Sequence, residues 1–250
     1  LLKIRANNEA GRAFALYTAQ QLDVTKFSDD PASRKLAADR VALLTPVVKA
    51  YLTDKGLENC IEGQQVLGGH GFIREWGMEQ IVRDTRIALL YEGTTQIQAL
   101  DLLGRKVLQT QGAMLRNFTK IIHKFCQANE GNADMAQFVN PLAQLNKEWG
   151  DVTMRIGMKA MSNADEAGAA AVDYMMFSGY VTLAYLWALM AQVAQQKLAA
   201  GEGDAAFYKA KVQSAQFYFK KILPRTKAHV DMIDSGAETL MQMSADGFAF

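Results

Sequence analysis

Apolar residues recur three or four positions apart over most of the chain, which is the spacing of helices with one buried face. Asp30 as N-cap and Pro31 at the first helical position predict the start of a long helix. We expect this helix to continue to about Val66, with a kink or a loosened turn at Pro46, because proline lacks a backbone N–H group. One continuous apolar face of the helix consists of Ala37, Val41, Leu44, Val48 and Tyr51.

Further helices are expected after the glycine-rich break at 68–71. A short helix is predicted over 77–86, another opens near Thr94, and the polar stretch 127–134 indicates a loop. No segment shows the alternation typical of a strand, so the sequence predicts an all-α fold made of helical bundles. In the Ala- and Met-rich second half we expect helices at 136–160, 165–198, 203–230 and 236–246.

The segment 174–194 is long enough to span a membrane, since its 21 residues carry no charge. Ser178, Thr182 and Gln192 make it only moderately apolar, and no cluster of Lys or Arg lies beside it to set an orientation. A central helix buried on all sides in a bundle has the same composition. We therefore expect a buried helix and no transmembrane span.

Composition narrows the class of protein. Half of the 250 residues are apolar, and 27 Lys and Arg balance 26 Asp and Glu, which argues against a general nucleic-acid binder. Two cysteines are too few for a disulfide framework and suit a reducing compartment. Because the chain starts at Leu1 without Met or a targeting segment, we expect it to be a piece of a longer polypeptide.

Two stretches contain candidate functional residues. The first, Gln65-Val66-Leu67-Gly68-Gly69, ends a helix in a turn whose missing Cβ atoms would let a ligand approach the backbone. A plain helix C-cap followed by a turn explains the same residues. His123 and Cys126 lie three apart on a helix, but no second pair completes a metal site, so no metal is expected.

The second stretch surrounds Glu92, which follows the apolar run 87–91 and precedes Gly93. Partial desolvation would raise the pKa of such a carboxylate towards that of a general base, whereas a position near a helix N-terminus is the structural alternative. Thr94, Thr95 and Gln96 open the next helix, where they can cap it or contact a polar cofactor group.

Together, residues 65–98 closely resemble the C-terminal signature of the acyl-CoA dehydrogenases. Three motifs carry the resemblance in order: Q-x-x-G-G-x-G-[FY] from Gln65, R-D-x-[KR]-I over 83–87 and Y-E-G-T-[ST]-x-I-Q over 91–98. Residues 1–110 resemble the last four helices of the family's catalytic core. Residues 111–250 resemble the helical extension of a subgroup that includes the 3-methylmercaptopropionyl-CoA dehydrogenases.

The resemblance implies an FAD-dependent α,β-dehydrogenation of an acyl-CoA thioester to the trans-2-enoyl-CoA. Glu92 would be the base that removes the α-proton, while the β-hydrogen leaves as hydride to FAD. Gly93 would line the thioester site and Tyr91 would flank the acyl pocket. The residues implied to contact FAD, the first five of them across to a neighbouring subunit, are Gln65, Val66, Leu67, Gly68, Gly69, Thr94, Thr95 and Gln96.

The resemblance also implies that electron-transfer flavoprotein accepts the electrons and that the protein is a homodimer or homotetramer. The expected location is the bacterial cytoplasm, with the mitochondrial matrix as the alternative. The family's N-terminal and middle β-domains are absent from these residues, so we expect the chain alone to hold FAD weakly or not at all and to be inactive. Two alternatives stay open. One is an acyl-CoA oxidase, and the other is a non-catalytic helical module for oligomerisation or membrane-surface attachment.

Overall fold

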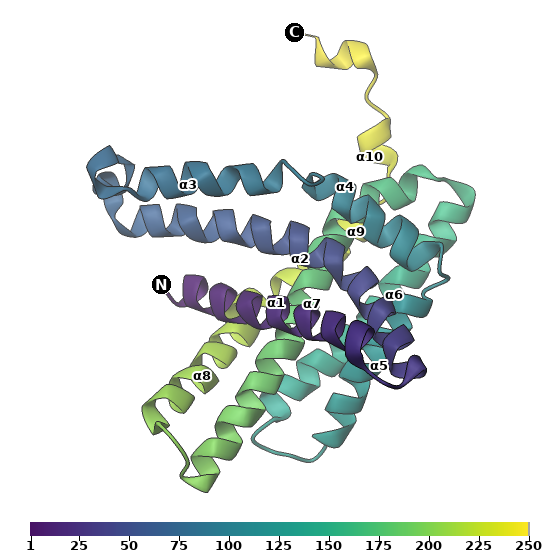
Figure 1. The fold of residues 1–250 in the computed structure, drawn as a ribbon. Helices are drawn as coiled ribbons and strands as arrows, with labels where there is room; N and C mark the ends of the chain where they lie inside the picture. The colour runs from purple at the N-terminus through teal and green to yellow at the C-terminus, as the bar shows by residue number, and fades with distance from the viewer. Residues whose placement is uncertain (250) are drawn as a thin grey trace.

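The computed structural model describes residues 1–249, and in this part of the chain all regular structure is helical (Figure 1), which confirms the predicted all-α fold. The first half contains α1 (Leu2–Phe27), α2 (Pro31–Val66), the 3₁₀ helices η1 (Gly68–Phe72) and η2 (Arg74–Trp76), α3 (Met78–Arg86), the 3₁₀ helix η3 (Ile87–Leu89), α4 (Thr95–Leu100) and the π-helix η4 (Asp101–Leu108). The second half contains α5 (Ala113–Ala128), α6 (Ala136–Ser162), α7 (Asp165–Ala200), α8 (Ala205–Phe217), the π-helix η5 (Tyr218–Ile222), α9 (Arg225–Asp234), α10 (Glu238–Met241) and the 3₁₀ helix η6 (Ala245–Phe248).

The start of α2 is determined by its cap. The carboxylate of Asp30 accepts hydrogen bonds from the backbone N–H groups of Ala32 and Ser33, at 3.1 and 3.0 Å. The helix then continues through Pro46 to Val66, and its ribbon bends part-way along (Figure 1). Both predicted ends of this helix are therefore confirmed.

The predicted helix over 203–230 is wrong as one unbroken element. It is interrupted at Pro224, which has no N–H group to continue the α-helical bonds. Before this proline the backbone widens into η5, where Leu223 N–H donates to the Tyr218 carbonyl at 2.9 Å. The predicted helix over 236–246 is likewise reduced to α10 and η6, and the left-handed backbone of Gly236, with a φ of 77°, delays its start to Glu238.

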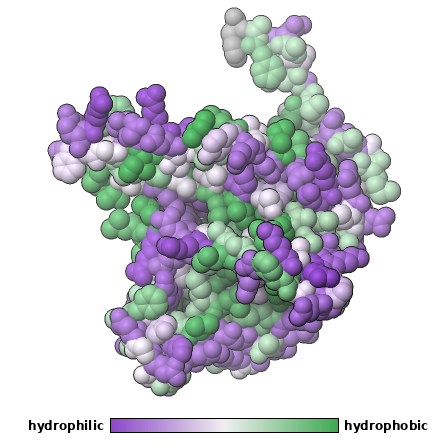
Figure 2. Space-filling view, viewed as in Figure 1, coloured by the Kyte–Doolittle hydropathy of each residue, from purple (hydrophilic) through white to green (hydrophobic). Residues whose placement is uncertain are grey.

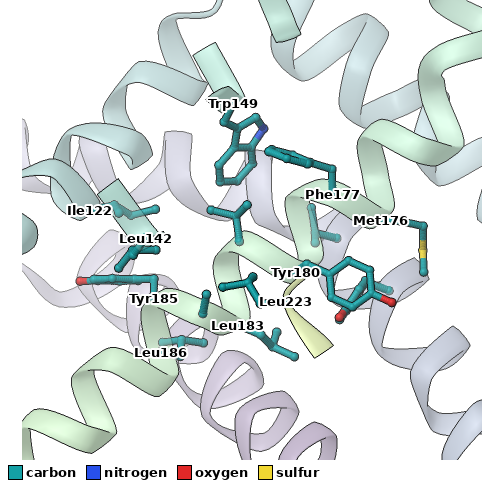
Figure 3. Packing of buried hydrophobic residues seen from close by; sticks show 14 of the residues in the cluster. Ile122, Leu142, Trp149, Met176, Phe177, Tyr180, Leu183, Tyr185, Leu186 and Leu223 are labelled. Atoms are coloured by element: carbon teal, nitrogen blue, oxygen red, sulfur yellow. The ribbon is translucent and has the colours of Figure 1, made fainter. Parts of the chain in front are cut away.

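The uncharged segment expected to be buried is the centre of α7. By length and composition α7 could cross a membrane, but 78% of its most apolar stretch is buried within residues 1–249. Its side chains pack against those of α5 and α6, where Trp149 meets Phe177 with ring centroids 6.3 Å apart (Figure 3). Trp187 of α7 donates its indole N–H to the Ala6 carbonyl of α1 at 3.2 Å. The first and second halves of the chain thus share one hydrophobic core.

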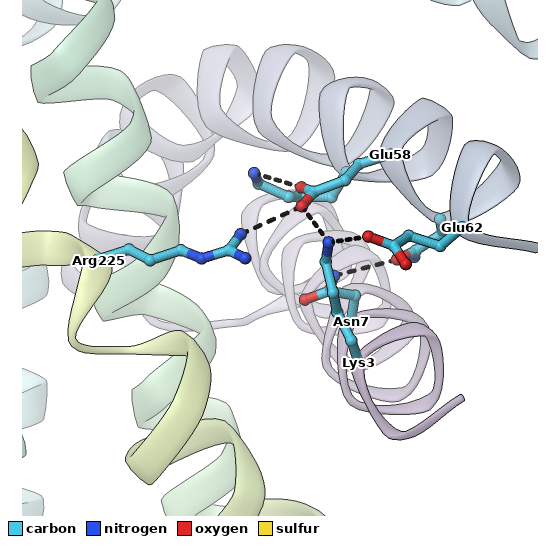
Figure 4. Close-up of polar contacts among 7 residues, drawn as sticks. Lys3, Asn7, Glu58, Glu62 and Arg225 are labelled. Atoms are coloured by element: carbon cyan, nitrogen blue, oxygen red, sulfur yellow. Dashed lines mark hydrogen bonds and ion pairs between the residues drawn. The ribbon is translucent and has the colours of Figure 1, made fainter. Parts of the chain in front are cut away.

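A group of charged side chains joins α1, α2 and α9 at one side of this core (Figure 4). Glu58 of α2 accepts from Lys3 at 2.6 Å, from Lys55 at 2.7 Å and from Arg225 at 3.1 Å. Burial alone would raise the pKa of Glu58, but these three donors outweigh burial and lower the pKa to about 2. Glu62 also contacts Lys3, at 2.6 Å.

The C-terminal part of α2 and the antiparallel α3 form a hairpin that projects from the bundle (Figure 1). Apolar and polar side chains alternate on its surface (Figure 2). The apolar residues exposed on the hairpin and on the segment that follows it include Val66, Phe72, Trp76, Ile81, Leu90 and Ile97. A surface of this kind is typical of a region that contacts another domain, subunit or ligand.

Candidate functional site

Glu92 and Gly93 form a tight turn between η3 and α4. Their φ angles are 57° and 87°, so two consecutive residues have left-handed backbone. Glycine adopts this conformation readily, whereas a residue with a Cβ does so at a cost in free energy. A strained acidic residue next to glycine is the kind of backbone feature that clusters at functional sites.

Two side chains from different helices hold the carbonyl groups of this turn. Gln98 of α4 donates its side-chain amide N–H to the Glu92 carbonyl at 2.9 Å. Lys49 of α2 donates its ammonium group to the Gly93 carbonyl. The φ angle favours glycine at position 93, and a Cβ built there would lie 2.9 Å from Gln98 Nε2 and would displace the end of that side chain.

Of the three polar residues after the turn, the first caps α4 and the other two do not. Thr94 is the N-cap of α4, and its hydroxyl oxygen accepts from the Ile97 N–H group at 3.4 Å. Capping, the structural alternative left open by the sequence, therefore accounts for Thr94 within this chain. Thr95 is half-buried and Gln96 is exposed.

The side chain of Glu92 is exposed, contrary to the prediction that it is partly desolvated. The apolar run before it forms η3, in which Ile87 is itself half exposed, and Leu90 and Tyr91 after η3 are also exposed. Residues 1–249 therefore provide no apolar cover for the carboxylate. The turn instead presents Glu92 to the outside of this chain.

The predicted diglycine turn follows the last residues of α2. Gln65 and Val66 are exposed at the end of that helix, and Gly68 begins η1 with a φ of 58°. A Cβ built on Gly68 or on Gly69 would have nothing within 4 Å in the described chain. Both glycines are also exposed, so the backbone of this turn is open to a ligand.

The structure does not bring the diglycine turn and Glu92 together. The Glu92–Gly93 turn lies beside Lys49, in the middle of α2, whereas Gln65 is the next-to-last residue of α2, whose end is at the tip of the projecting hairpin (Figure 1). Sixteen residues of helix separate Lys49 from Gln65, or about 24 Å along the axis at about 1.5 Å per residue. Within one chain the two predicted parts are thus separate places on the surface.

Both parts of the sequence match described protein families. Residues 1–108 match the family described as "Acyl-CoA dehydrogenase, C-terminal domain", and residues 118–244 match "Acetyl-CoA dehydrogenase C-terminal like". This chain belongs to the acyl-CoA dehydrogenase family. The predicted resemblance is therefore confirmed.

Relatives with curated names extend beyond this chain. The 3-methylmercaptopropionyl-CoA dehydrogenase of Ruegeria pomeroyi is 34% identical over 245 residues, which are 98% of this chain and 41% of the relative. The broad-specificity linear acyl-CoA dehydrogenase of Mycobacterium tuberculosis is 30% identical over 257 residues, covering 99% of this chain and 42% of the relative. The chain thus spans about two fifths of the length of these relatives.

Solved structures have the same fold. Caenorhabditis elegans ACDH-11 in complex with C11-CoA superposes with a TM-score of 0.74 at 16% identity, over 98% of this chain and 39% of that protein. The acyl-CoA dehydrogenase of Bacillus anthracis complexed with FAD gives 0.65 at 17% identity, over 97% of this chain and 46% of that one. At these identities the likeness concerns the fold alone.

Two residues that contact the Glu92–Gly93 turn are not indicated by the sequence. Gln98 closes the motif that begins at Tyr91, yet only its hydrogen bond to Glu92 shows what it does here. Lys49 is 44 residues from Gly93 and lies in the middle of α2. No local sequence signal indicates that its ammonium group reaches the turn.

Proposed function

We propose that this chain acts as the C-terminal part of an FAD-dependent acyl-CoA dehydrogenase, in which Glu92 removes the α-proton of an acyl-CoA thioester. The observation that supports the proposal best is the strained turn at Glu92–Gly93. It presents a carboxylate on rigid backbone at the surface, held by donors from α2 and α4. Proton abstraction needs a base whose position is fixed before the substrate arrives.

The exposure of Glu92 in this chain is consistent with that role. The relatives it matches are more than twice as long, so other parts of such an enzyme are available to cover the carboxylate. A covered carboxylate between an acyl chain and apolar side chains loses water, which strengthens it as a base. Tyr91 and Gly93 flank Glu92 and would line the acyl and thioester positions.

The residues proposed to bind FAD fit a group that carries phosphates. Gly68 and Gly69 expose bare backbone with free space at both Cβ positions, as close approach of a pyrophosphate requires. Gln65, Val66 and Leu67 complete that contact, while Thr94, Thr95 and Gln96 would bind FAD beside Glu92. When bound, FAD accepts the hydride that leaves the β-carbon of the acyl chain.

The distance between the two parts supports an oligomer. Because the hairpin tip lies about 24 Å along α2 from the residue that holds the Glu92 turn, the tip would reach FAD of a neighbouring subunit. A homodimer or homotetramer satisfies this geometry. Electron-transfer flavoprotein is the proposed acceptor, and the bacterial cytoplasm is the proposed location.

The full-length protein tests the assignment of Glu92. Glu92→Gln keeps the size of the side chain but removes the base, so turnover with an artificial electron acceptor and exchange of the substrate α-proton should both be lost while FAD stays bound. Glu130→Gln, which changes an exposed glutamate in the turn between α5 and α6, is the matched control and should retain both activities. Retained turnover in Glu92→Gln contradicts the assignment. If the wild-type full-length protein instead consumes oxygen and releases hydrogen peroxide, it is an acyl-CoA oxidase.

The 250-residue chain by itself tests whether other parts of the enzyme are needed to bind FAD. We propose that it holds FAD weakly or not at all and has no turnover, since the family's other domains contribute most of the flavin site. Absorbance of FAD after gel filtration measures binding directly. Stoichiometric flavin on the purified chain would contradict this proposal without affecting the assignment of Glu92.

A further inference from the structure

Lys49 is placed unusually for a lysine in the middle of a helix. It is half-buried, between Val48 and the fully buried Ala50, and its ammonium group donates to the backbone carbonyl of Gly93. It takes part in none of the ion pairs among residues 1–249. Its partner in the described chain is thus a neutral carbonyl, and a hydrogen bond from a charged donor is stronger than one between neutral groups.

The carbonyl that Lys49 holds belongs to the residue after Glu92. Together with the hydrogen bond from Gln98 to the Glu92 carbonyl, this contact restrains both peptide groups on the C-terminal side of the candidate base. The turn is otherwise free to relax, since Glu92 carries a Cβ and disfavours a φ of 57°. A change of that φ angle would swing the carboxylate away from its present direction.

We infer that Lys49 is a positioning residue for Glu92, because it anchors the left-handed Glu92–Gly93 turn to α2 and so sets the direction of the carboxylate. This inference rests on the proposed role of Glu92 as the base. Lys49 itself need not touch the substrate. Its effect is on the geometry of proton abstraction, and a displacement of about 1 Å can cost on the order of a hundredfold in rate.

The test uses the full-length protein and the variants Lys49→Met and Lys49→Arg. Methionine keeps the length of the side chain and removes its donors, whereas arginine keeps a cation with donors. We expect Lys49→Met to lower kcat by about tenfold to a hundredfold per bound flavin, with KM changed by less than about threefold. Lys49→Arg should recover most of the loss. Lys35→Met, an exposed lysine of the same helix, is the matched control and should behave as the wild type.

Hydrogen exchange provides a readout that does not depend on turnover. The backbone amides of residues 91–98 should exchange faster in Lys49→Met than in the wild type or in Lys35→Met, because the turn has lost one of its two anchors. Should Lys49→Met fail to fold, Lys49→Ala removes the same donors and places the residue that helices favour most in α2. It should give the same loss in kcat and the same faster exchange.

The outcomes separate this inference from the proposed function. If Glu92→Gln is inactive but Lys49→Met, or Lys49→Ala in its place, keeps its kcat per flavin, the positioning role is wrong and the base assignment stands. If the Lys49 variant loses only stability, with unchanged kcat per flavin, Lys49 is merely structural and the inference is overturned. If Glu92→Gln retains turnover, the proposed function itself fails.

Discussion

The ring of Tyr51 in α2 lies directly against the backbone of Gly179 in α7. A Cβ built on Gly179 would lie 2.1 Å from Tyr51 Cδ2 and 2.3 Å from Cγ, far inside any contact distance. The Tyr51 ring is fully buried there and meets the Tyr180 ring edge-on, with centroids 5.2 Å apart. The regions of the chain that match two different family descriptions are therefore joined by a contact that only glycine permits.

Gly179→Ala should be strongly destabilising, because a methyl group cannot enter this contact without moving the Tyr51 ring or separating the helices. We expect the free energy of unfolding to fall by about 3 kcal/mol. Denaturant unfolding of the chain measures it. Gly168→Ala, in an exposed part of α7 with nothing within 4 Å of its Cβ position, is the control. That change should instead stabilise the helix by about 0.5–1 kcal/mol.

A double variant checks that the Tyr51 ring is the cause. Tyr51→Leu in the Gly179→Ala background opens space at the contact, so the two changes together should cost less than the sum of each alone. Strict additivity would show that alanine at position 179 destabilises the protein for another reason.

Glu58 should make the protein sensitive to acid. Its pKa is about 2 in the folded chain against a usual value of 4.5. The stabilisation it provides is therefore present above pH 4.5 and is lost as the pH falls towards 2, by about 2–3 kcal/mol. Unfolding measured across this pH range should show a decline that Glu58→Gln flattens, and the two proteins should converge at low pH.

Glu62→Gln is the matched control for this acid response. Among residues 1–249 the carboxylate of Glu62 pairs only with Lys3, and its side chain is 44% exposed against 25% for Glu58. Removing the charge of Glu62 should change the free energy of unfolding by less than about 1 kcal/mol. Equal effects of the two variants would contradict the central position of Glu58 in this group of charges.

The two cysteines should differ in reactivity. Burial raises the pKa of the Cys126 thiol from a usual 9.0 to about 11, so at pH 8 its thiolate fraction is about a hundredfold below that of an ordinary thiol. Cys60 is only half-buried. Alkylation followed by mass spectrometry should label Cys60 first, and both cysteines at similar rates once the chain is unfolded. Fast labelling of Cys126 in the folded protein would show that it is not shielded.

Gly69→Ala separates cofactor binding from folding. Because its Cβ would meet nothing within 4 Å in the described chain, the change should leave the free energy of unfolding within about 0.5 kcal/mol. In the full-length protein, however, it should weaken FAD binding if the backbone of this turn contacts the cofactor. Titration with FAD measures the affinity, and an unchanged value would remove Gly69 from the proposed site.

Much of the fold could be predicted because its causes are local. Asp30 and Pro31 start α2, and Thr94 starts α4, through contacts within three residues of each cap. The periodic spacing of apolar residues identified most of the helices, and three short motifs identified the family. Prediction failed at Pro224 because the residues around it have good helical spacing, and that pattern concealed a single missing backbone donor.

The sequence by itself determined where most of the helices form, which family the chain belongs to and which residues are candidates for chemistry. Only the tertiary structure decided that Glu92 is exposed, that the diglycine turn lies far from it, and that Lys49 reaches Gly93. These properties depend on how helices pack against one another, and contacts between residues dozens of positions apart leave no periodic signal along a single chain. A cap or a motif acts over a few residues, whereas the direction of the Glu92 carboxylate depends on how α2 and α4 meet at its turn.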